Sequence, residues 1–542
     1  QTCLFISVRF WDNFLYIFVV NVKWKKQKFT DVECDTNEPP GSFKAVLFSL
    51  TGVPPERQNV MMPGGILGDA NYDGIKLRDG VTIMLMGTAE EIPPSLLSSS
   101  QAPIEPAEIH ERKLRMPIGI VNLGNTCYMN GTLQLLFLLP ELRDALSVVE
   151  PSRLPPSMNE NSKALVTSMR FLFQSMEKAE KAVIPVFFLK ALHSNFPQFA
   201  TTASNAAVGQ LDPTLSAAGL GMPVYQQQDA NECWTEVVRI LQKVTVDSSA
   251  LQNKPGLPQS FGTSGGWNPI DRYLTGQLTS TLTCTEGEEP AQQSVDTFTQ
   301  LSCFIDKEVK YLHTGIRNGL EGTLTKNSDV LGREAVYKKI SRVSRLPGYL
   351  CVQFVRFYYK EKEHINAKIL KDIKFPLNLD LYEFCAKDLQ EKLLPAREKV
   401  RIEEDEEALS AKAKKLPNSV NDDNVPNPID NPDLYEPYWF EDDPGSNNTG
   451  FYELQGVLTH QGRSSTSGHY VSWIKKKGKW FKLDDDTVSE VGTEDIMKLS
   501  GGGDWHCAYL LLYGPRRIKI RPARSTTAVG GSAAMETSKP PT

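Results

Sequence analysis

The sequence has no Cys-x-x-Cys pair and no His-Glu-x-x-His motif in its 542 residues, and cysteine is scarce. The nine cysteines are an odd number and lie far apart, which excludes a dense disulfide framework and the common zinc-finger spacings. We therefore expect no structural metal, and a zinc-dependent peptidase or a zinc-finger adaptor has little support. A reducing, intracellular setting is the simplest interpretation of this cysteine usage.

An excess of positive charge and a long apolar run are also absent. Lys and Arg number 59 against 65 Asp and Glu, and the net charge of −6 argues against a nucleic-acid partner bound by overall charge. The apolar run 13–22 is shorter than the ~20 residues that cross a bilayer. It has the length of a weak signal segment, yet it continues into the alternating pattern Val20, Val22, Trp24, which is typical of a strand. We expect neither nucleic acid nor a membrane as a partner.

The composition that is present is ordinary for a globular protein, with 40% hydrophobic and 23% charged residues. Shifts in composition predict a small α+β domain at 16–93, a Pro- and Ser-rich linker at 94–112, a large globular domain at 113–516 and a disordered tail at 517–542. Within the large domain we expect loops at 201–223, 253–267 and 401–448. The last of these is acidic and rich in Asn and Pro, which predicts partial disorder.

The small domain shows a strand, a helix and further strands in turn. A strand-like run covers 16–24, a helical pattern covers 42–50, and short strands follow at 60–62 and 81–86. The stretches Thr51-Gly-Val-Pro-Pro-Glu-Arg-Gln58 and Asp79-Gly-Val-Thr-Ile-Met-Leu-Met86 resemble ubiquitin, which implies a β-grasp fold. Ubiquitin ends in a free Gly-Gly tail, whereas this chain continues, so the domain would serve for interaction and not for conjugation. The plain alternative is a generic small α+β domain.

The segment 119–134 is the most informative for chemistry. Its later part predicts a helix with one buried stripe, formed by Met129, Leu133, Leu136 and Phe137. Thr126 or Asn125 can cap the start of this helix. Cys127 would then lie in the first turn, where the helix macrodipole favours the thiolate, which is the nucleophilic form. The plain alternative is a buried cysteine that acts as a small hydrophobe.

The segment 468–486 predicts a β-hairpin, because two aromatic and β-branched runs flank Lys-Lys-Lys-Gly-Lys. A two-residue loop at Lys476-Lys477 would place His469 opposite Asp484. A three-residue loop ending in Gly478 would place His469 opposite Asp485 instead. Both registers put a carboxylate beside the imidazole, as in a cysteine-protease triad, and the spacing does not choose between them. The plain alternative is a surface histidine on a charged hairpin.

These two segments resemble the Cys box and the His box of the ubiquitin-specific protease family. A third segment, Tyr225-Gln-Gln-Gln-Asp-Ala-Asn-Glu-Cys-Trp234, is similar to the family's Gln-Gln-Asp-Ala-x-Glu signature, and residues 346–357 match its central strand. Together the matches cover most of 113–516. The resemblance implies a papain-like cysteine protease domain with fingers, palm and thumb subdomains, so the expected fold class is α+β with a β-grasp domain in front.

The resemblance also implies roles for individual residues. Cys127 matches the nucleophile, His469 the general base and Asp484 the carboxylate that orients the base. Asn122 matches the oxyanion-hole side chain. Many relatives carry paired zinc ligands in the fingers, whereas Cys284 and Cys303 stand alone here, which again predicts no metal and no cofactor.

A second set of residues would hold the basic C-terminal tail of ubiquitin; by resemblance these are Gln227, Asp229, Tyr470 and Ser465. For Asp229 the alternative is an ordinary acid at a helix N-terminus. The resemblance further implies that residues 464–467 form a loop over the cleft, which must move to admit the tail.

The resemblance therefore predicts a thiol hydrolase that cleaves the bond after the C-terminal Gly of ubiquitin. The ubiquitin-like domain in front of the protease domain further implies a proteasome-associated member of the family. The expected partners are ubiquitinated proteins and the proteasome regulatory particle, and the expected location is the cytoplasm, with the nucleus as a second site. The alternative from another class is a catalytically silent, ubiquitin-binding regulator of the proteasome, against which the complete triad argues.

Overall fold

The structure is a computed structural model that describes residues 17–25, 27–36, 39–51, 53, 57–68, 71–72, 74–87, 116–202, 224–247, 266–360, 365–414, 434–464, 467–503 and 505–520. The predicted linker 94–112 and most of the predicted loops at 201–223 and 253–267 lie outside these residues. None of the described helices is long and apolar enough to cross a membrane.

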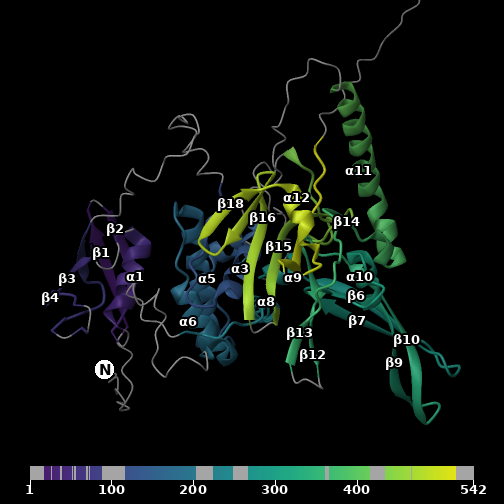
Figure 1. Cartoon of the computed structure of the whole chain (residues 1–542), viewed down its shortest axis with the longest axis horizontal. Coiled ribbons are helices and arrows are strands. Elements are labelled where there is room, and N and C mark those ends of the chain that lie inside the picture. Colours follow the sequence, from purple (N-terminus) through teal and green to yellow (C-terminus); the bar gives the residue numbers. More distant parts are fainter. Residues whose placement is uncertain are drawn as a thin grey trace, which may run out of the picture.

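The N-terminal unit is a mixed five-stranded sheet in the order β2-β1-β5-β3-β4 with one helix packed on it (Figure 1). Its elements are β1 Ile17–Trp24, β2 Gln27–Asp35, α1 Pro40–Thr51, β3 Asn59–Met62, β4 Gly65–Ile66 and β5 Thr82–Met86. Alternating residues of the strands are buried, so Val20, Val22 and Ile83 form one core with Leu47 of α1. The predicted helix and strands are confirmed, but the sequence pattern did not indicate β2, which pairs with β1 as a hairpin.

A helical layer follows, with α3 at its centre. The elements are α3 Cys127–Phe137, α4 Pro140–Val148, η3 Pro151–Arg153, α5 Glu160–Lys178, α6 Val186–Asn195, η4 Pro197–Ala200, α8 Ala230–Leu241 and α9 Pro269–Tyr273. Residues 127–136 of α3 are all buried, because this helix lies between α8 and the sheet strand β16 (Ser467–Lys476). The predicted helix from Cys127 is confirmed.

An eight-stranded sheet packs against this layer, in the order β18-β17-β16-β15-β19-β11-β8 with β14 paired to β15. Its remaining strands are β8 Leu301–Phe304, β11 Leu350–Val355, β14 Asn378–Asp380, β15 Phe451–Ser464, β17 Lys479–Asp484, β18 Thr487–Val491 and β19 Cys507–Pro515. Every residue of β19 is buried, as expected for a central strand. Near one edge lie α12 Thr493–Met497 and η8 Lys498–Ser500.

A separate four-stranded sheet, β7-β6-β10-β9, extends from the far end of the molecule (Figure 1). Its strands are β6 Gly276–Cys284, β7 Gln292–Phe298, β9 Glu321–Ser328 and β10 Arg333–Arg345, with α10 Leu312–Leu320 beside it. A hairpin of β12 Phe357–Lys360 and β13 Ile365–Lys368 leads back to the main sheet. The helical layer, the main sheet and this sheet correspond to the thumb, palm and fingers, and the predicted α+β class is confirmed.

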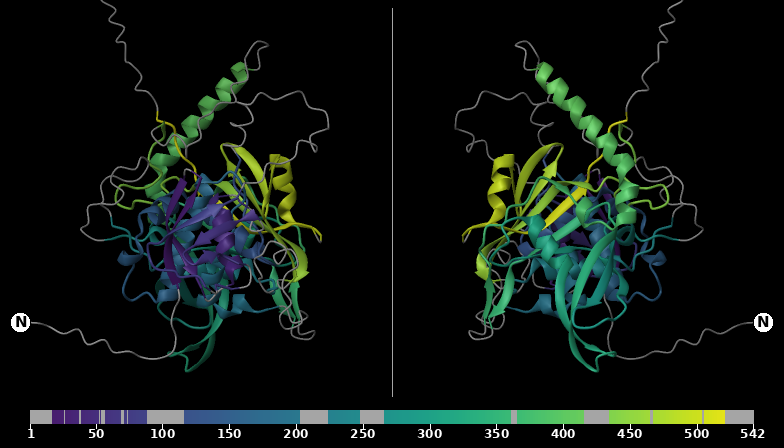
Figure 2. Two further views of the ribbon diagram at one scale, coloured as in Figure 1. Left: turned by 90° about the vertical axis from the view of Figure 1, so that its left-hand side faces the viewer. Right: turned by 90° about the vertical axis from the view of Figure 1, so that its right-hand side faces the viewer.

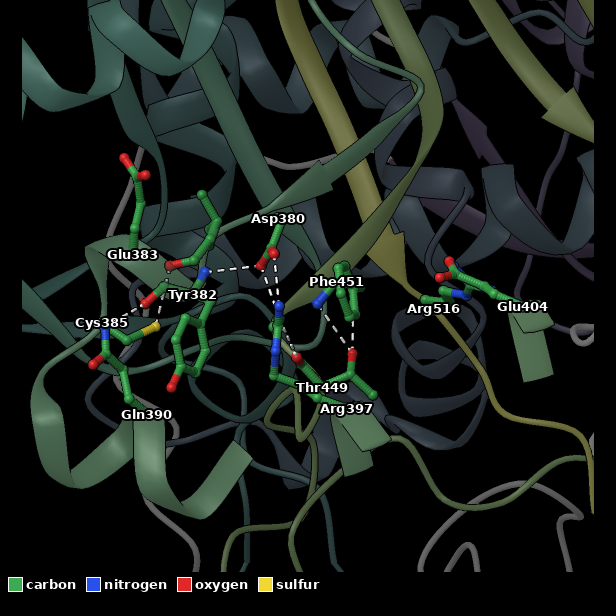
Figure 3. A network of polar contacts seen from close by, with 12 residues as sticks. Asp380, Tyr382, Glu383, Cys385, Gln390, Arg397, Glu404, Thr449, Phe451 and Arg516 are labelled. Carbon is green, nitrogen blue, oxygen red and sulfur yellow. Dashed lines mark hydrogen bonds and ion pairs between the residues drawn. The ribbon is translucent and has the colours of Figure 1, made fainter. Parts of the chain in front are cut away.

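The prediction of a loop at 401–448 was wrong for 401–414, because α11 runs from Lys387 to Lys414 and projects from the body (Figure 2). Residues 415–433 lie outside the described residues, and 434–448 contain no named helix or strand. Helix α11 follows the short helix η6 Tyr382–Phe384. Arg397 anchors its base: the guanidinium binds both oxygens of Asp380 at 2.9 and 2.7 Å and donates to the carbonyl of Thr449 (Figure 3). The same group lies over the ring of Phe451 at 4.1 Å. An acidic composition therefore does not preclude a helix that is anchored along its first half.

The chain stays packed beyond residue 516, where the large domain was expected to end. The side chain of Arg517 is 10% exposed and lies 3.7 Å from Glu141 of α4, and Ile518 is buried. Arg516 pairs with Glu404 of α11 (Figure 3), and Lys519 pairs with Glu407 at 3.0 Å. The final described residues thus lie along α11 instead of forming part of a free tail.

Candidate active site

The loop before α3 is shaped by the side chain of Asn122. Its Oδ1 accepts hydrogen bonds from the backbone amides of Gly124 and Thr126 at 3.0 and 3.1 Å and from the Thr126 hydroxyl at 3.2 Å. Thr126 occupies the N-cap position of α3, but its hydroxyl accepts from the amide of Leu123 and does not cap the helix. The predicted cap by Thr126 or Asn125 was wrong: upstream groups use the Thr126 hydroxyl, and the Asn125 amide donates to the carbonyl of Tyr225.

Cys127 is the first residue of α3 and is only 2% exposed. Its Sγ accepts a hydrogen bond from the backbone amide of Tyr470 at 3.4 Å, which joins the helix to the strand that carries His469. Burial raises the pKa of the Cys127 thiol to about 12; the Tyr470 amide lowers it in part and the nearby charge of Asp485 raises it further. The raised pKa does not show the thiolate that the helix N-terminus was expected to favour, and desolvation is its largest cause.

His469 and Asp484 form a direct pair, with His469 Nε2 2.6 Å from Asp484 Oδ1. The other carboxylate oxygen, Oδ2, lies 2.8 Å from Lys482 Nζ. Burial by itself would raise the pKa of Asp484, but the hydrogen bonds from Lys482 and His469 outweigh it and hold the pKa below its ordinary value. Asp484 is therefore an ionised group that orients the imidazole.

Neither predicted register of this hairpin is correct. Lys476 pairs with Lys479, so the loop is Lys477-Gly478, and both loop residues have positive φ angles of 50° and 79°. Two left-handed residues are typical of a type I′ turn, in which glycine at the second position is favoured. The paired residues end at Ser472 and Leu483, and His469 reaches Asp484 diagonally, beyond the end of the ladder.

Asp485, the other carboxylate that the sequence left open, does not bind His469 directly in this way. Its Oδ2 accepts from Asn122 Nδ2 and its Oδ1 from Asn130 Nδ2, both at 2.8 Å. Burial raises the pKa of Asp485, although both amides oppose the shift. Gly119 makes the contact possible, because a Cβ there would lie 2.8 Å from the carbonyl oxygen of Asp485. Asn130 was not predicted to be part of the site, and only its position one turn after Cys127 could have indicated it.

The residues expected to bind a ubiquitin tail lie close to this centre. Asp229 caps α8 through the amides of Asn231 and Glu232, and both its oxygens accept from the Tyr509 hydroxyl, at 2.7 and 2.8 Å. In this state Asp229 therefore acts as an acid at a helix N-terminus, as the alternative interpretation expected. Burial raises its pKa. Tyr470 is buried, with its ring tilted over that of Tyr509 at 6.1 Å.

Gln227 is also buried, and its amide nitrogen has no hydrogen-bond partner among the described residues. A buried donor without a partner costs free energy. Ser465 lies outside the described residues, between the end of β15 and the start of β16.

One group of potential metal ligands occurs among the described residues, formed by His469, Asp484 and Asp485 with ligand atoms within 4.8 Å of one another. Each of these side chains is already engaged by protein groups: His469 by Asp484, Asp484 by Lys482, and Asp485 by two amides. Hydrogen bonding accounts for the cluster. The eight cysteines of the described residues are all free thiols.

Comparison with known proteins agrees with this geometry. The family model described as "Ubiquitin carboxyl-terminal hydrolase" matches residues 118–513. The chain belongs to the ubiquitin carboxyl-terminal hydrolase family. It is accordingly a thiol-dependent deubiquitinase, and the matched region contains the Cys127, Asp229 and His469 segments.

Relatives of this hydrolase are similar over almost their whole length. Ubiquitin carboxyl-terminal hydrolase 14 of Caenorhabditis elegans is 38% identical over 96% of this chain and 98% of its own. Ubiquitin carboxyl-terminal hydrolase 7 of Arabidopsis thaliana is 38% identical over 93% and 100% of the two chains. Ubiquitin carboxyl-terminal hydrolase 6 of Schizosaccharomyces pombe is 37% identical over 92% and 99%. The similarity thus includes the N-terminal unit as well as the catalytic domain.

Proposed function

We propose that this hydrolase uses Cys127 to cleave the bond after the C-terminal Gly of ubiquitin on substrates held at the proteasome. The observation that carries the catalytic assignment is the junction of α3 and β16. The Tyr470 amide contacts Cys127 Sγ, and the adjacent residue His469 is oriented by Asp484 at 2.6 Å. Two segments more than 300 residues apart thus meet at this junction, and we assign to them the nucleophile, the base and the orienting carboxylate.

In the proposed reaction His469 accepts the thiol proton of Cys127, and the thiolate attacks the carbonyl carbon of the ubiquitin Gly. Asn122 Nδ2 has two hydrogens, and Asp485 takes one of them, which leaves one for the oxyanion. The backbone amide of Cys127 supplies a second donor. Each such donor is typically worth ~2.7–4 kcal/mol in the transition state. The His469 imidazolium then protonates the leaving amine, and water hydrolyses the thioester.

The resting state described here is a closed one. Both oxygens of the buried Asp229 are held by the Tyr509 hydroxyl, so this carboxylate is not free to bind a basic peptide tail. Binding of ubiquitin would bring the tail to Asp229 and Gln227 and would have to free these side chains. We therefore expect low activity in the isolated chain and a rise when a partner shifts the cleft towards the open state.

The N-terminal unit is the proposed proteasome-docking element. On the outer face of its sheet Met61 lies directly opposite both Met84 and Ile66, and all three are 44–61% exposed. Adjacent exposed apolar side chains on neighbouring strands are typical of a protein interaction surface. This supports docking by an interaction domain that precedes the catalytic domain.

The proposal is tested with ubiquitin that carries a thiol-reactive group at its C-terminus. Wild type should form an adduct on Cys127, more rapidly with proteasomes than without them, whereas Cys127→Ala should form none. Cys284→Ala is the matched control, because Cys284 is also a free thiol but lies in the fingers. Bound ubiquitin with no adduct under either condition would instead support the silent regulator.

A further inference from the structure

The carboxylate of Asp484 is shared between two partners. One oxygen lies 2.6 Å from His469 Nε2 and the other lies 2.8 Å from Lys482 Nζ. Lys482 and Asp484 are two residues apart on β17, so their side chains point to the same face. The side chains of His469, Asp484 and Lys482 are 29–35% exposed. The ammonium group therefore neutralises part of the carboxylate charge by direct contact.

The position of Lys482 is fixed by more than this ion pair. Lys482 stands directly opposite Trp473 of β16, and its ammonium group lies 5.9 Å from the centre of the indole ring. A cation near an aromatic ring is held there by the ring quadrupole. Two contacts, with Asp484 and with Trp473, therefore hold the Lys482 side chain in place beside the proposed triad.

The chemistry of this arrangement differs from that of an unshared carboxylate. A full negative charge beside an imidazole stabilises the imidazolium and raises its pKa, while a nearby cation has the opposite effect. A carboxylate whose second oxygen is held by an ammonium group still orients the ring, but it stabilises the imidazolium less. A base that starts from a protonated thiol must be neutral to accept the proton, so this distinction bears directly on catalysis.

We propose that Lys482 is a positioning residue that tunes the general base: it holds one oxygen of Asp484, so that Asp484 orients His469 without keeping the imidazole protonated. This rests on the proposed role of His469. Lys482 touches neither substrate nor thiol and acts only through Asp484.

The sign of the effect depends on every charge around His469. The carboxylates are Asp484 and Asp485, and the cation Lys482 lies beside Asp484 on β17. The rings of His460 and His506 also interact with His469, and Lys368 binds His460. Burial holds the pKa of His460 at about 3 and that of His506 at about 4, so both rings are neutral at working pH. Removing Lys482 therefore leaves an acidic excess around His469, which favours the imidazolium.

The test is the pH dependence of kcat/KM for the full chain with a ubiquitin C-terminal fluorogenic amide. In Lys482→Met the acid limb should move up by about 0.5 to 1 pH unit, with KM little changed. Lys482→Arg should restore the position of the limb, because it keeps the cation. Lys482→Gln is the second neutral variant in case the first folds poorly.

Lys479→Met is the matched control. Lys479 lies on the same strand, forms a similar ion pair with Glu490 at 2.7 Å, and its loss changes the net charge equally. Its acid limb should coincide with that of wild type. An unmoved acid limb in both neutral Lys482 variants, or an equal shift in Lys479→Met, would overturn the proposal.

A second readout separates this inference from the proposed catalytic role. NMR titration of the His469 imidazole reads the proton directly and needs no turnover, so it gives a result even if His469 proves not to be the base. Lys482→Met should increase the fraction of His469 that is imidazolium at a given pH, and this increase should be at most half as large in an Asp484→Asn background. An equal increase in both backgrounds would contradict action through Asp484.

Discussion

At the scale of single residues, Asp485 is where the polar contacts around the nucleophile converge. It fixes Asn122 and Asn130 through their amide nitrogens. In Asp485→Ala both amides lose their acceptor, which should lower kcat by ~10–100-fold, because the oxyanion donor is no longer aimed. The unpaired amides should also cost about 1–3 kcal/mol of unfolding free energy. Steady-state kinetics and urea unfolding measure the two effects.

The neighbouring exposed residue Asp486 provides the control for that prediction. Its side chain accepts only a weak 3.4 Å contact from Thr487 among the described residues, so Asp486→Ala should retain both kcat and stability. Equal kinetic losses in the two variants would show that the acidic run acts through its overall charge and not through Asp485.

The thiol of Cys127 gives a prediction about pH. Its pKa of about 12 lies above the ordinary value of 9.0, so the folded chain favours the protonated form. This contribution to stability is complete below pH 9 and is lost as the pH rises towards 12. Iodoacetamide should therefore modify Cys127 slowly at pH 9 in the folded chain and rapidly in urea, as peptide mass spectrometry would show. Rapid modification of the folded chain at pH 9 would contradict the buried, protonated thiol.

At the scale of elements, the β12–β13 hairpin is joined to the catalytic strands by a buried lysine. Lys368 Nζ lies 3.1 Å from His460 Nδ1 and donates to the His460 carbonyl at 2.5 Å. The other ring nitrogen of His460 lies 3.1 Å from the carbonyl oxygen of Ser467, at the start of the strand that carries His469. The imidazole thus connects three strands behind the catalytic centre.

Lys368→Met should remove this connection while keeping the side-chain length. We expect a loss of about 1–3 kcal/mol of unfolding free energy, because the His460 acceptors remain buried without a donor, and a fall in kcat. Denaturant unfolding and kinetics on the same preparations measure both. Lys374→Met, at an exposed position on the segment that follows β13, should change neither value; an equally mild effect of Lys368→Met would show that the connection is dispensable.

These elements also show how far sequence reasoning extends. The stripe of apolar residues in α3 and the alternation in β1 follow from local periodicity, so both were predictable. The β16–β17 register depends on the left-handed backbone conformation of Lys477. A lysine in the sequence does not predict that conformation. The anchoring of α11 depends on Arg397 meeting Asp380 and Phe451, which local composition does not reveal.

The candidate site divides in the same way. Cys127, His469 and Asp484 could be predicted because each lies in a recognisable segment, and these segments are in contact in the structure. The contact of Asp485 with Asn122 arises from the approach of two loops at Gly119, so no single segment carries its signal.

At the scale of the whole molecule, the N-terminal unit and the catalytic centre have separate hydrophobic cores, so their roles can be tested by separate substitutions. A charge on the docking face should weaken proteasome binding at least ~10-fold, since an unpaired carboxylate in an apolar interface is costly. Met84→Asp should therefore lower the ratio of proteasome-stimulated to basal activity. Leu50→Asp places the same charge at a similarly exposed apolar position on α1 and should keep the ratio. If Met84→Asp also keeps the ratio, docking does not use the sheet face, and the apolar strip of Met61, Ile66 and Met84 has another occupant.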